Sequence, residues 1–208
     1  MPKPPLKENQ SGLKNAYSQY AELAKSSGSP LSPLHVGDTY LPPAIGCRMQ
    51  DLSISEYPRL HQYAPVQGRS DLIAGIAKYR QQREGLLPSN DEIVVTAGAT
   101  GGLFGLASAL IEPGDEVIML APYWPLFGNA IRHYGGTTKS LSVFDCLNAP
   151  DEIESQLAAL ITPKTVAIYW NTPHNPTGLV LPESWLNTFT RFAVSNNLWI
   201  VADEVYEH

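Results

Sequence analysis

Two short apolar runs, residues 165–170 and 198–202, constrain the fold of this chain more than any other feature. Both are rich in β-branched residues and are flanked by turn or loop residues. Runs of this kind are typical of strands that are buried on both faces, as in a parallel sheet. A helix is expected between them, over 182–195, because parallel strands need a crossover connection. We therefore expect an α/β fold.

Polar residues follow both runs at the point where each strand should end. Asn175 comes just after the first run, Asp203 ends the second, and Tyr206 follows three residues later. In open α/β sheets, ligands bind outside the carboxyl ends of the strands. We therefore expect these three side chains to lie on one rim of the sheet.

The same alternation of strands and helices extends toward the N-terminus. Further strands are expected over 91–96, 117–121 and 137–143, and helices over 70–84, from about 98 to 111, up to about 134, and over 150–161. Strands and helices that alternate with short loops predict right-handed crossovers and helices on both faces. The predicted fold class is a three-layer α/β fold with a mostly parallel, doubly wound sheet.

A glycine-rich turn, residues 97–103, joins one predicted strand to the next helix. Unpaired amides and the helix dipole at such a start favour a bound anion. The turn lacks the spacing of a dinucleotide-binding fingerprint and the Gly-Lys-Ser/Thr of a Walker loop. A helix that packs closely on its strand through these glycines is the remaining alternative.

The N-terminal part has a different character. Residues 1–12 are expected to form a flexible arm, 13–24 an amphipathic helix, and 26–33 a break rich in Ser, Gly and Pro. A short strand over 34–40 then leads into a Pro-rich loop. This predicts an arm and helix over 1–33 and a large domain over 34–208.

Composition excludes several kinds of partner. The net charge of −6 over 208 residues argues against nucleic acid or an anionic membrane as the main partner. Cys47 and Cys146 form neither a disulfide framework nor a metal-binding spacing, and no histidine pattern predicts a metal ligand set. No apolar run is long enough to span a bilayer. A cytoplasmic location is therefore the expectation.

Residues 175–178, Asn-Pro-Thr-Gly, followed by Asp203-x-x-Tyr206, resemble the signature of pyridoxal 5'-phosphate (PLP) enzymes with the aspartate aminotransferase fold. The resemblance implies that Asn175 and Tyr206 hydrogen-bond the cofactor's phenolic oxygen, and that Asp203 pairs with its pyridine nitrogen. It implies amino-group transfer between an amino acid and a 2-oxo acid, with Asp203, Tyr206 and Asn175 as catalytic residues.

The same resemblance implies roles for other positions. Residues matching Ala99, Thr100 and Gly101 hold the cofactor phosphate in the family, and an aromatic residue matching Trp124 stacks on the ring. Tyr63 corresponds to a tyrosine that crosses a homodimer interface to the partner's cofactor phosphate. Gly37 and Asn175 are expected near the substrate. For Gly37, Tyr63 and Trp124, a simple turn or packing role remains the alternative.

The resemblance covers residues 34–208, about the first half of a typical member. The family's catalytic lysine and its carboxylate-binding arginine should follow Asp203 by some tens of residues, and no lysine of this chain stands in that register. We expect the remaining large-domain strands and a small C-terminal domain to follow in a longer enzyme. A lyase or synthase on the same fold, or a non-catalytic ligand-sensing domain, are the alternative functions.

Overall fold

The computed structural model describes residues 26–28 and 41–207. The chain divides into two units, residues 1–63 and 64–208. In the first unit, the described part contains the short 3-10 helix η2 (Met49–Asp51), and Asp51 Oδ2 accepts a hydrogen bond from the Gly46 amide at 2.8 Å. The predicted arm, the helix over 13–24, the strand over 34–40 and Gly37 lie outside the described residues.

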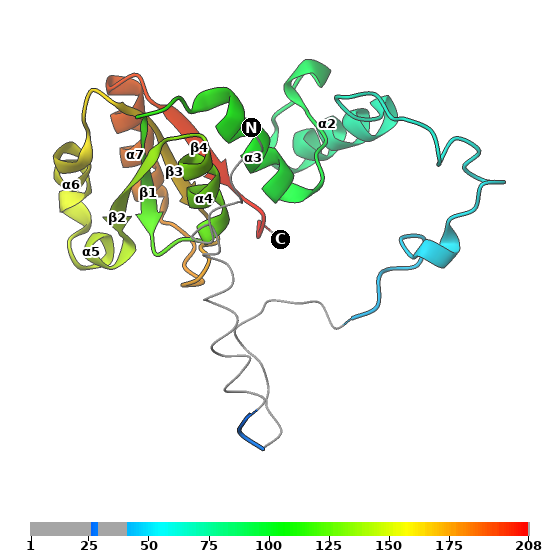
Figure 1. Cartoon of the computed structure of the whole chain (residues 1–208), viewed down its shortest axis with the longest axis horizontal. Coiled ribbons are helices and arrows are strands. Elements are labelled where there is room, and N and C mark those ends of the chain that lie inside the picture. Colours follow the sequence, from blue (N-terminus) through cyan, green and yellow to red (C-terminus); the bar gives the residue numbers. More distant parts are fainter. Residues whose placement is uncertain (1–25, 29–40, 208) are drawn as a thin grey trace, which may run out of the picture. The chain divides into compact units, whose positions relative to one another are not determined.

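A parallel sheet forms the centre of the second unit (Figure 1). Its described strands have the order β2-β1-β3-β4, and every neighbouring pair is parallel. The strands are β1 (Glu116–Ala121), β2 (Thr137–Ser142), β3 (Thr165–Asn171) and β4 (Trp199–Asp203). The predictions for 117–121, 137–143, 165–170 and 198–202 are confirmed to within a residue at each end.

Helices lie between and before these strands. They are α2 (Ser70–Glu84), α3 (Gly98–Leu110), α4 (Pro125–His133), α5 (Val143–Asn148), α6 (Ile153–Leu160) and α7 (Glu183–Ser195). Local signals set several bounds: α4 begins with a proline at its first position, and α2 ends at Gly85, which has a left-handed φ of 71°. Within the described ranges, no helix combines the length and the apolar character needed to cross a bilayer.

Alternate strand residues build two separate cores. Val117 and Met119 of β1 pack in a cluster with α3 and α4, whereas Ile118 and Leu120 pack in a cluster with α5, α6 and α7. Tyr169 and Trp170 of β3 divide in the same way. Because successive side chains of a strand point to opposite faces, helices cover both faces of the sheet. The predicted three-layer, doubly wound architecture is confirmed.

The strand order creates a topological switch point between β1 and β3. From β1 the chain crosses to β2 on one side, and from β3 it crosses to β4 on the other side. The carboxyl ends of β1, at Ala121, and of β3, at Asn171, therefore flank the topological switch point of the sheet. In open α/β folds, this is the place where ligands bind.

The strand predicted over 91–96 is wrong. Residues 90–92 form a 3-10 helix, η3 (Asn90–Glu92), and 93–96 belong to no strand, although the backbone of Ile93 is extended. The Val95 amide instead donates to the Gln67 carbonyl at 2.8 Å, and Val94 is 63% exposed. A β-branched run favours an extended backbone, but it becomes a strand only beside a partner.

The connection after β2 is also more complex than predicted. Residue 143, predicted to end the strand, instead begins α5, because the Ser142 hydroxyl accepts a hydrogen bond from the Asp145 amide at 3.2 Å and caps that helix. The helix predicted over 150–161 consists of the 3-10 turn η4 (Pro150–Glu152) followed by α6.

Candidate active site

Asp203, the last residue of β4, has its carboxylate fixed by two donors. The Tyr169 hydroxyl donates to Oδ2 at 2.9 Å, and the Val205 amide donates to Oδ1 at 3.2 Å. The side chain of Tyr169 is almost completely buried, and Asp203 is half-buried. The carboxylate is therefore held in one orientation at the end of the strand.

Asn171, the last residue of β3, joins the two strand ends. Its Nδ2 donates to the Asp203 carbonyl at 2.8 Å, and its Oδ1 accepts from the Asn175 amide at 2.7 Å. The Thr172 amide also donates to the Asp203 carbonyl, at 3.0 Å. Asn171 is buried, so its amide uses both its donor and its acceptor capacity inside the protein. These contacts place the loop after β3 against the end of β4.

Asn175 and Tyr206 lie together on that loop and on the segment after β4. Asn175 Nδ2 donates to the Tyr206 hydroxyl oxygen at 3.2 Å. Asn175 is half-buried and Tyr206 is 48% exposed, so both polar groups remain accessible. The structure thus brings Asn175, Asp203 and Tyr206 to one edge of the sheet, as the strand-end argument predicts.

His174 stabilises the same loop through its side chain and its backbone. Its Nδ1 lies 2.7 Å from the Thr177 hydroxyl oxygen, and its backbone accepts from the Gly178 amide at 2.7 Å. The ring is buried, and Nε2 has no hydrogen-bond partner among the described residues. Burial lowers the pKa of His174, against the smaller opposing effect of the Leu120 backbone. The imidazole is therefore neutral near pH 7.

The start of α3 presents unpaired backbone donors. Its N-cap, Ala97, makes no side-chain hydrogen bond, and the first turn contains no acidic residue. The Gly98 amide donates to the Thr96 carbonyl at 2.9 Å, and residues 99–101 are exposed. The next amides of the first turn have no partner within the helix. This helix start is suited to an anion.

The glycines of this turn serve different purposes. Gly98 has a φ of 72°, which a residue with a side chain rarely adopts, and a Cβ added there would meet no atom within 4 Å. At Gly102 a Cβ would lie 3.2 Å from the Thr96 hydroxyl oxygen. Close packing on the preceding segment therefore explains Gly102, whereas Gly98 is required for the direction of the backbone.

Two aromatic residues follow β1 at the switch point. The Tyr123 hydroxyl donates to Thr138 Oγ1 of β2 at 3.2 Å, and a Cβ on Gly128 would lie 3.0 Å from the Tyr123 ring. Tyr123 is therefore held against α4 and β2. Trp124, the N-cap residue of α4, is half-buried. The stacking role predicted for Trp124 remains a prediction.

Tyr63 and two lysines complete the set of positions considered for the site. Tyr63 belongs to the first unit, and its side chain is fully exposed. Two lysines of the second unit lie toward the amino ends of the strands: Lys139 pairs with Glu116 at 3.3 Å, and Lys164 precedes β3. They are thus at the edge of the sheet opposite to Asp203.

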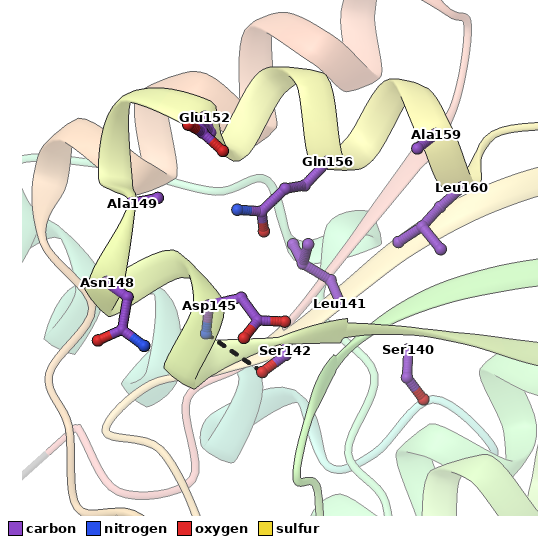
Figure 2. A pocket seen from close by; sticks show the side chains of 10 residues that line it. All are labelled: Ser140, Leu141, Ser142, Asp145, Asn148, Ala149, Glu152, Gln156, Ala159 and Leu160. Atoms are coloured by element: carbon purple, nitrogen blue, oxygen red, sulfur yellow. Dashed lines mark hydrogen bonds between the residues drawn. The ribbon is translucent and has the colours of Figure 1, made fainter.

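A separate cavity of about 510 Å³ lies beside β2, α5 and α6 (Figure 2). Its lining includes Ser140, Asp145, Glu152 and Gln156. None of its lining residues belongs to β3, β4 or the start of α3. The cavity is therefore not part of the polar edge that holds Asp203.

Comparison with known proteins agrees with this geometry. The family model described as aminotransferase class I and II matches residues 26–208. This chain belongs to the class I and II aminotransferase family. The chain is 36% identical over 151 residues to the aspartate/prephenate aminotransferase of Thermus thermophilus, an alignment that covers 71% of this chain and 38% of that protein.

Two further class I and II aminotransferases show the extent of the likeness. The aspartate aminotransferase of Streptomyces avermitilis is 29% identical over 213 residues, covering 99% of this chain and 52% of its own length. A structure of Thermus thermophilus aspartate aminotransferase with maleate superposes with a TM-score of 0.75 at 30% identity, over 93% of this chain and 50% of that chain. This chain thus spans about half, or less, of the length of these three matched chains.

Enzymes of the class I and II aminotransferase family depend on PLP, and the donor set of this chain fits that cofactor. Asp203 offers a carboxylate to a protonated ring nitrogen, and the Asn175 amide with the Tyr206 hydroxyl offers donors to an anionic oxygen. The uncapped start of α3 offers backbone amides to a phosphate. The ring nitrogen, the phenolic oxygen and the phosphate of the cofactor therefore each have a matching group in the described residues.

Sequence reasoning did not identify Tyr169 and Asn171. Both stand in a run that is otherwise apolar, where an aromatic residue is ordinarily part of the core. Asn171 could have been identified from its residue type, because a side-chain amide at the buried end of a strand needs hydrogen-bond partners. Tyr169 gave no comparable signal, since its partner depends on the register of a strand more than thirty residues later.

Proposed function

We propose that the intact protein transfers an amino group between an amino acid and a 2-oxo acid, with PLP as cofactor. The observation that carries this proposal is the Asn175–Tyr206 pair, 3.2 Å apart, on the same edge as the fixed carboxylate of Asp203. The membership of the chain in the class I and II aminotransferase family supports it.

In this proposal the residues of the edge bind and orient the cofactor. Asp203 keeps the ring nitrogen protonated, since an adjacent carboxylate favours the charged form of its partner. Asn175 and Tyr206 donate to the phenolic oxygen. When bound, PLP supplies an electron-poor ring that accepts the electrons left when the substrate loses its α-proton. Trp124 covers one face of the ring.

The backbone amides of Ala99, Thr100 and Gly101 bind the phosphate in the same proposal. Their direction is set by the left-handed turn at Gly98. The absence of an acidic side chain in the first turn of α3 supports this assignment, because a carboxylate there would repel the phosphate. Thr100 adds its hydroxyl as a further donor.

The wider organisation of the enzyme is part of the proposal. We infer a homodimer in which Tyr63, whose side chain is fully exposed in the single chain, reaches the partner's cofactor. Gly37 and Asn175 are proposed to contact the substrate. The same proposal includes a domain boundary between residues 33 and 34, further strands of the large domain, and a small domain. It also includes a cytoplasmic location, which the two free cysteines support.

Replacement of Asp203 by asparagine in the intact protein tests the function. Asn keeps the shape and removes the charge, so kcat/KM for transamination should fall by about 100-fold or more. Asp151→Asn makes the same change at an exposed position in η4 and should leave kcat/KM unchanged. Activity of Asp203→Asn within a few-fold of the wild type would contradict the role of Asp203.

The names of the relatives favour transamination over the alternatives. The matched proteins of Thermus thermophilus and Streptomyces avermitilis are both named as aminotransferases. A lyase or synthase does not pass the amino group of its substrate to a 2-oxo acid. Coupled assays with a panel of amino acids and 2-oxo acids distinguish these reactions, because only a transaminase needs both substrates.

A further inference from the structure

The proposed function assigns no role to the buried hydroxyl of Tyr169. Tyr169 is 1% exposed, and its ring packs on Phe127 of α4 with centroids 4.8 Å apart. Its hydroxyl donates to Asp203 Oδ2 at 2.9 Å. Burial, then the charge of Asp203, raises the pKa of Tyr169 far above its ordinary value. The hydroxyl is therefore always protonated and always available as a donor.

The register of the sheet explains how Tyr169 reaches Asp203. Tyr169 pairs with Val201 and Asn171 pairs with Asp203 on the neighbouring strand. Asp203 is thus the diagonal neighbour of Tyr169, two residues further along β4 and on the same face. Diagonal neighbours are within reach of a long aromatic side chain. A phenylalanine at 169 would keep the packing on Phe127 and lose only the contact with the carboxylate.

The contact also places Asp203 on the correct face for the proposed cofactor. Tyr169 and Val201 belong to the core cluster that includes α3 and α4. Asp203 therefore projects on the face covered by the helix whose uncapped start is suited to phosphate. The other carboxylate oxygen is held by the Val205 amide at 3.2 Å.

We propose that Tyr169 is a positioning residue that orients the Asp203 carboxylate toward the ring nitrogen of PLP. The inference rests on the proposed function, because it requires Asp203 to face that nitrogen. The hydrogen bonds from Tyr169 and Val205 each occupy a lone pair on a different carboxylate oxygen of Asp203. An ionised carboxylate also has lone pairs beyond those used by Tyr169 and Val205, so it can accept one further donor.

The test measures how strongly the intact protein discriminates PLP from its 1-deaza analogue, in which a C–H group replaces the ring nitrogen. Affinities are measured by fluorescence titration of the apoprotein with each compound. Wild type should prefer PLP, and Tyr169→Phe should lose about 10-fold of that preference, the value of a hydrogen bond to a charged group. The affinity for the 1-deaza analogue should be unchanged in Tyr169→Phe.

Two further variants separate the possible results. Tyr134→Phe removes a hydroxyl from a half-buried tyrosine at the far end of α4 and should keep the wild-type preference. Tyr169→Met also lacks the hydroxyl but packs differently. Tyr169→Met should lose the preference for PLP to the same extent as Tyr169→Phe. Agreement between the two variants would show that the loss comes from the missing hydroxyl and not from the packing of one particular replacement.

The outcomes distinguish this inference from the proposed function. If Asp203→Asn abolishes the preference for PLP and Tyr169→Phe retains it, the role of Tyr169 is overturned and the proposed function stands. An equal loss of affinity for both compounds in Tyr169→Phe also overturns it, because that loss is structural. If Asp203→Asn has no effect on the preference, the assignment of Asp203 in the proposed function fails, and the inference fails with it.

Discussion

Replacement of Gly98 by alanine probes the backbone at the start of α3. Gly98 has a φ of 72°, in the left-handed region, where a side chain costs roughly 1–2 kcal/mol. A Cβ at this position meets no atom within 4 Å, so the cost comes from the backbone alone. We expect Gly98→Ala to lower the free energy of unfolding by about 1–2 kcal/mol.

Gly105→Ala is the matched control in the same helix. A Cβ added at Gly105 also meets no atom within 4 Å, but its φ is outside the left-handed region. Alanine is better than glycine in a helix interior by roughly 0.5–1 kcal/mol, so this variant should be more stable than the wild type. The two variants should differ by about 1.5–3 kcal/mol, roughly a factor of 10 to 100 in the folding equilibrium.

Urea denaturation followed by far-UV circular dichroism measures this difference. Unchanged m-values would show that the variants differ in stability rather than in compactness. In the intact protein, Gly98→Ala should also weaken PLP binding, because the directions of the next amides depend on this turn, whereas Gly105→Ala should not. If Gly98→Ala is as stable as Gly105→Ala, the left-handed conformation is not required and the backbone argument for the phosphate site is refuted.

Three further predictions concern the described part of the chain. Because the pKa of His174 is lowered by burial, the unfolded chain holds its proton more readily, and stability should fall as pH drops below about 6.5. His174→Asn should flatten that decline in urea midpoints. Burial raises the pKa of the Cys146 thiol to about 11, so at about pH 8 Ellman's reagent should label exposed Cys47 at once and Cys146 only on unfolding. Arg80→Gln removes ion pairs with Glu84 at 2.9 Å, Glu207 at 3.5 Å and Glu204 at 3.9 Å, and it should cost about 0.2–1 kcal/mol for each pair, an effect that about 1 M salt should abolish.

Each of these predictions has a contradicting result. An unchanged slope of stability against pH in His174→Asn would show that this ring does not drive the acid sensitivity. Rapid labelling of Cys146 in the folded chain would contradict its burial. A cost of Arg80→Gln that persists in high salt would show that packing of the side chain, rather than its charge, is what stabilises the structure.

The sequence alone was sufficient to predict the rim that carries Asn175, Asp203 and Tyr206. Its basis was a short-range pattern: buried parallel strands are continuous apolar runs, and polar residues at their ends must lie at one edge. The same reasoning placed β1 and β2 to within a residue. The hydrophobic periodicity and the composition of a segment are local properties of the sequence, so they can be interpreted without knowledge of the fold.

Two of the failures concern contacts between distant segments, and one concerns a local helix cap. Residues 91–96 have the composition of a strand, but composition does not supply a neighbouring strand. The start of α5 depended on one hydrogen bond from the Asp145 amide to Ser142. The bond from Tyr169 to Asp203 depends on the register between β3 and β4, and a shift of one residue would move Asp203 to the other face.

The strand order also determines which strand pairings the rim requires. β3 pairs with β1 although β2, α5 and α6 separate them along the chain, so this step closes a long loop at an entropic cost. β4 pairs with β3, and only that pairing brings Asp203 to Tyr169. We therefore expect partly folded chains to lack the rim. A ligand that needs the rim binds only chains in which β1, β3 and β4 are all in place, and its binding energy then stabilises the whole sheet.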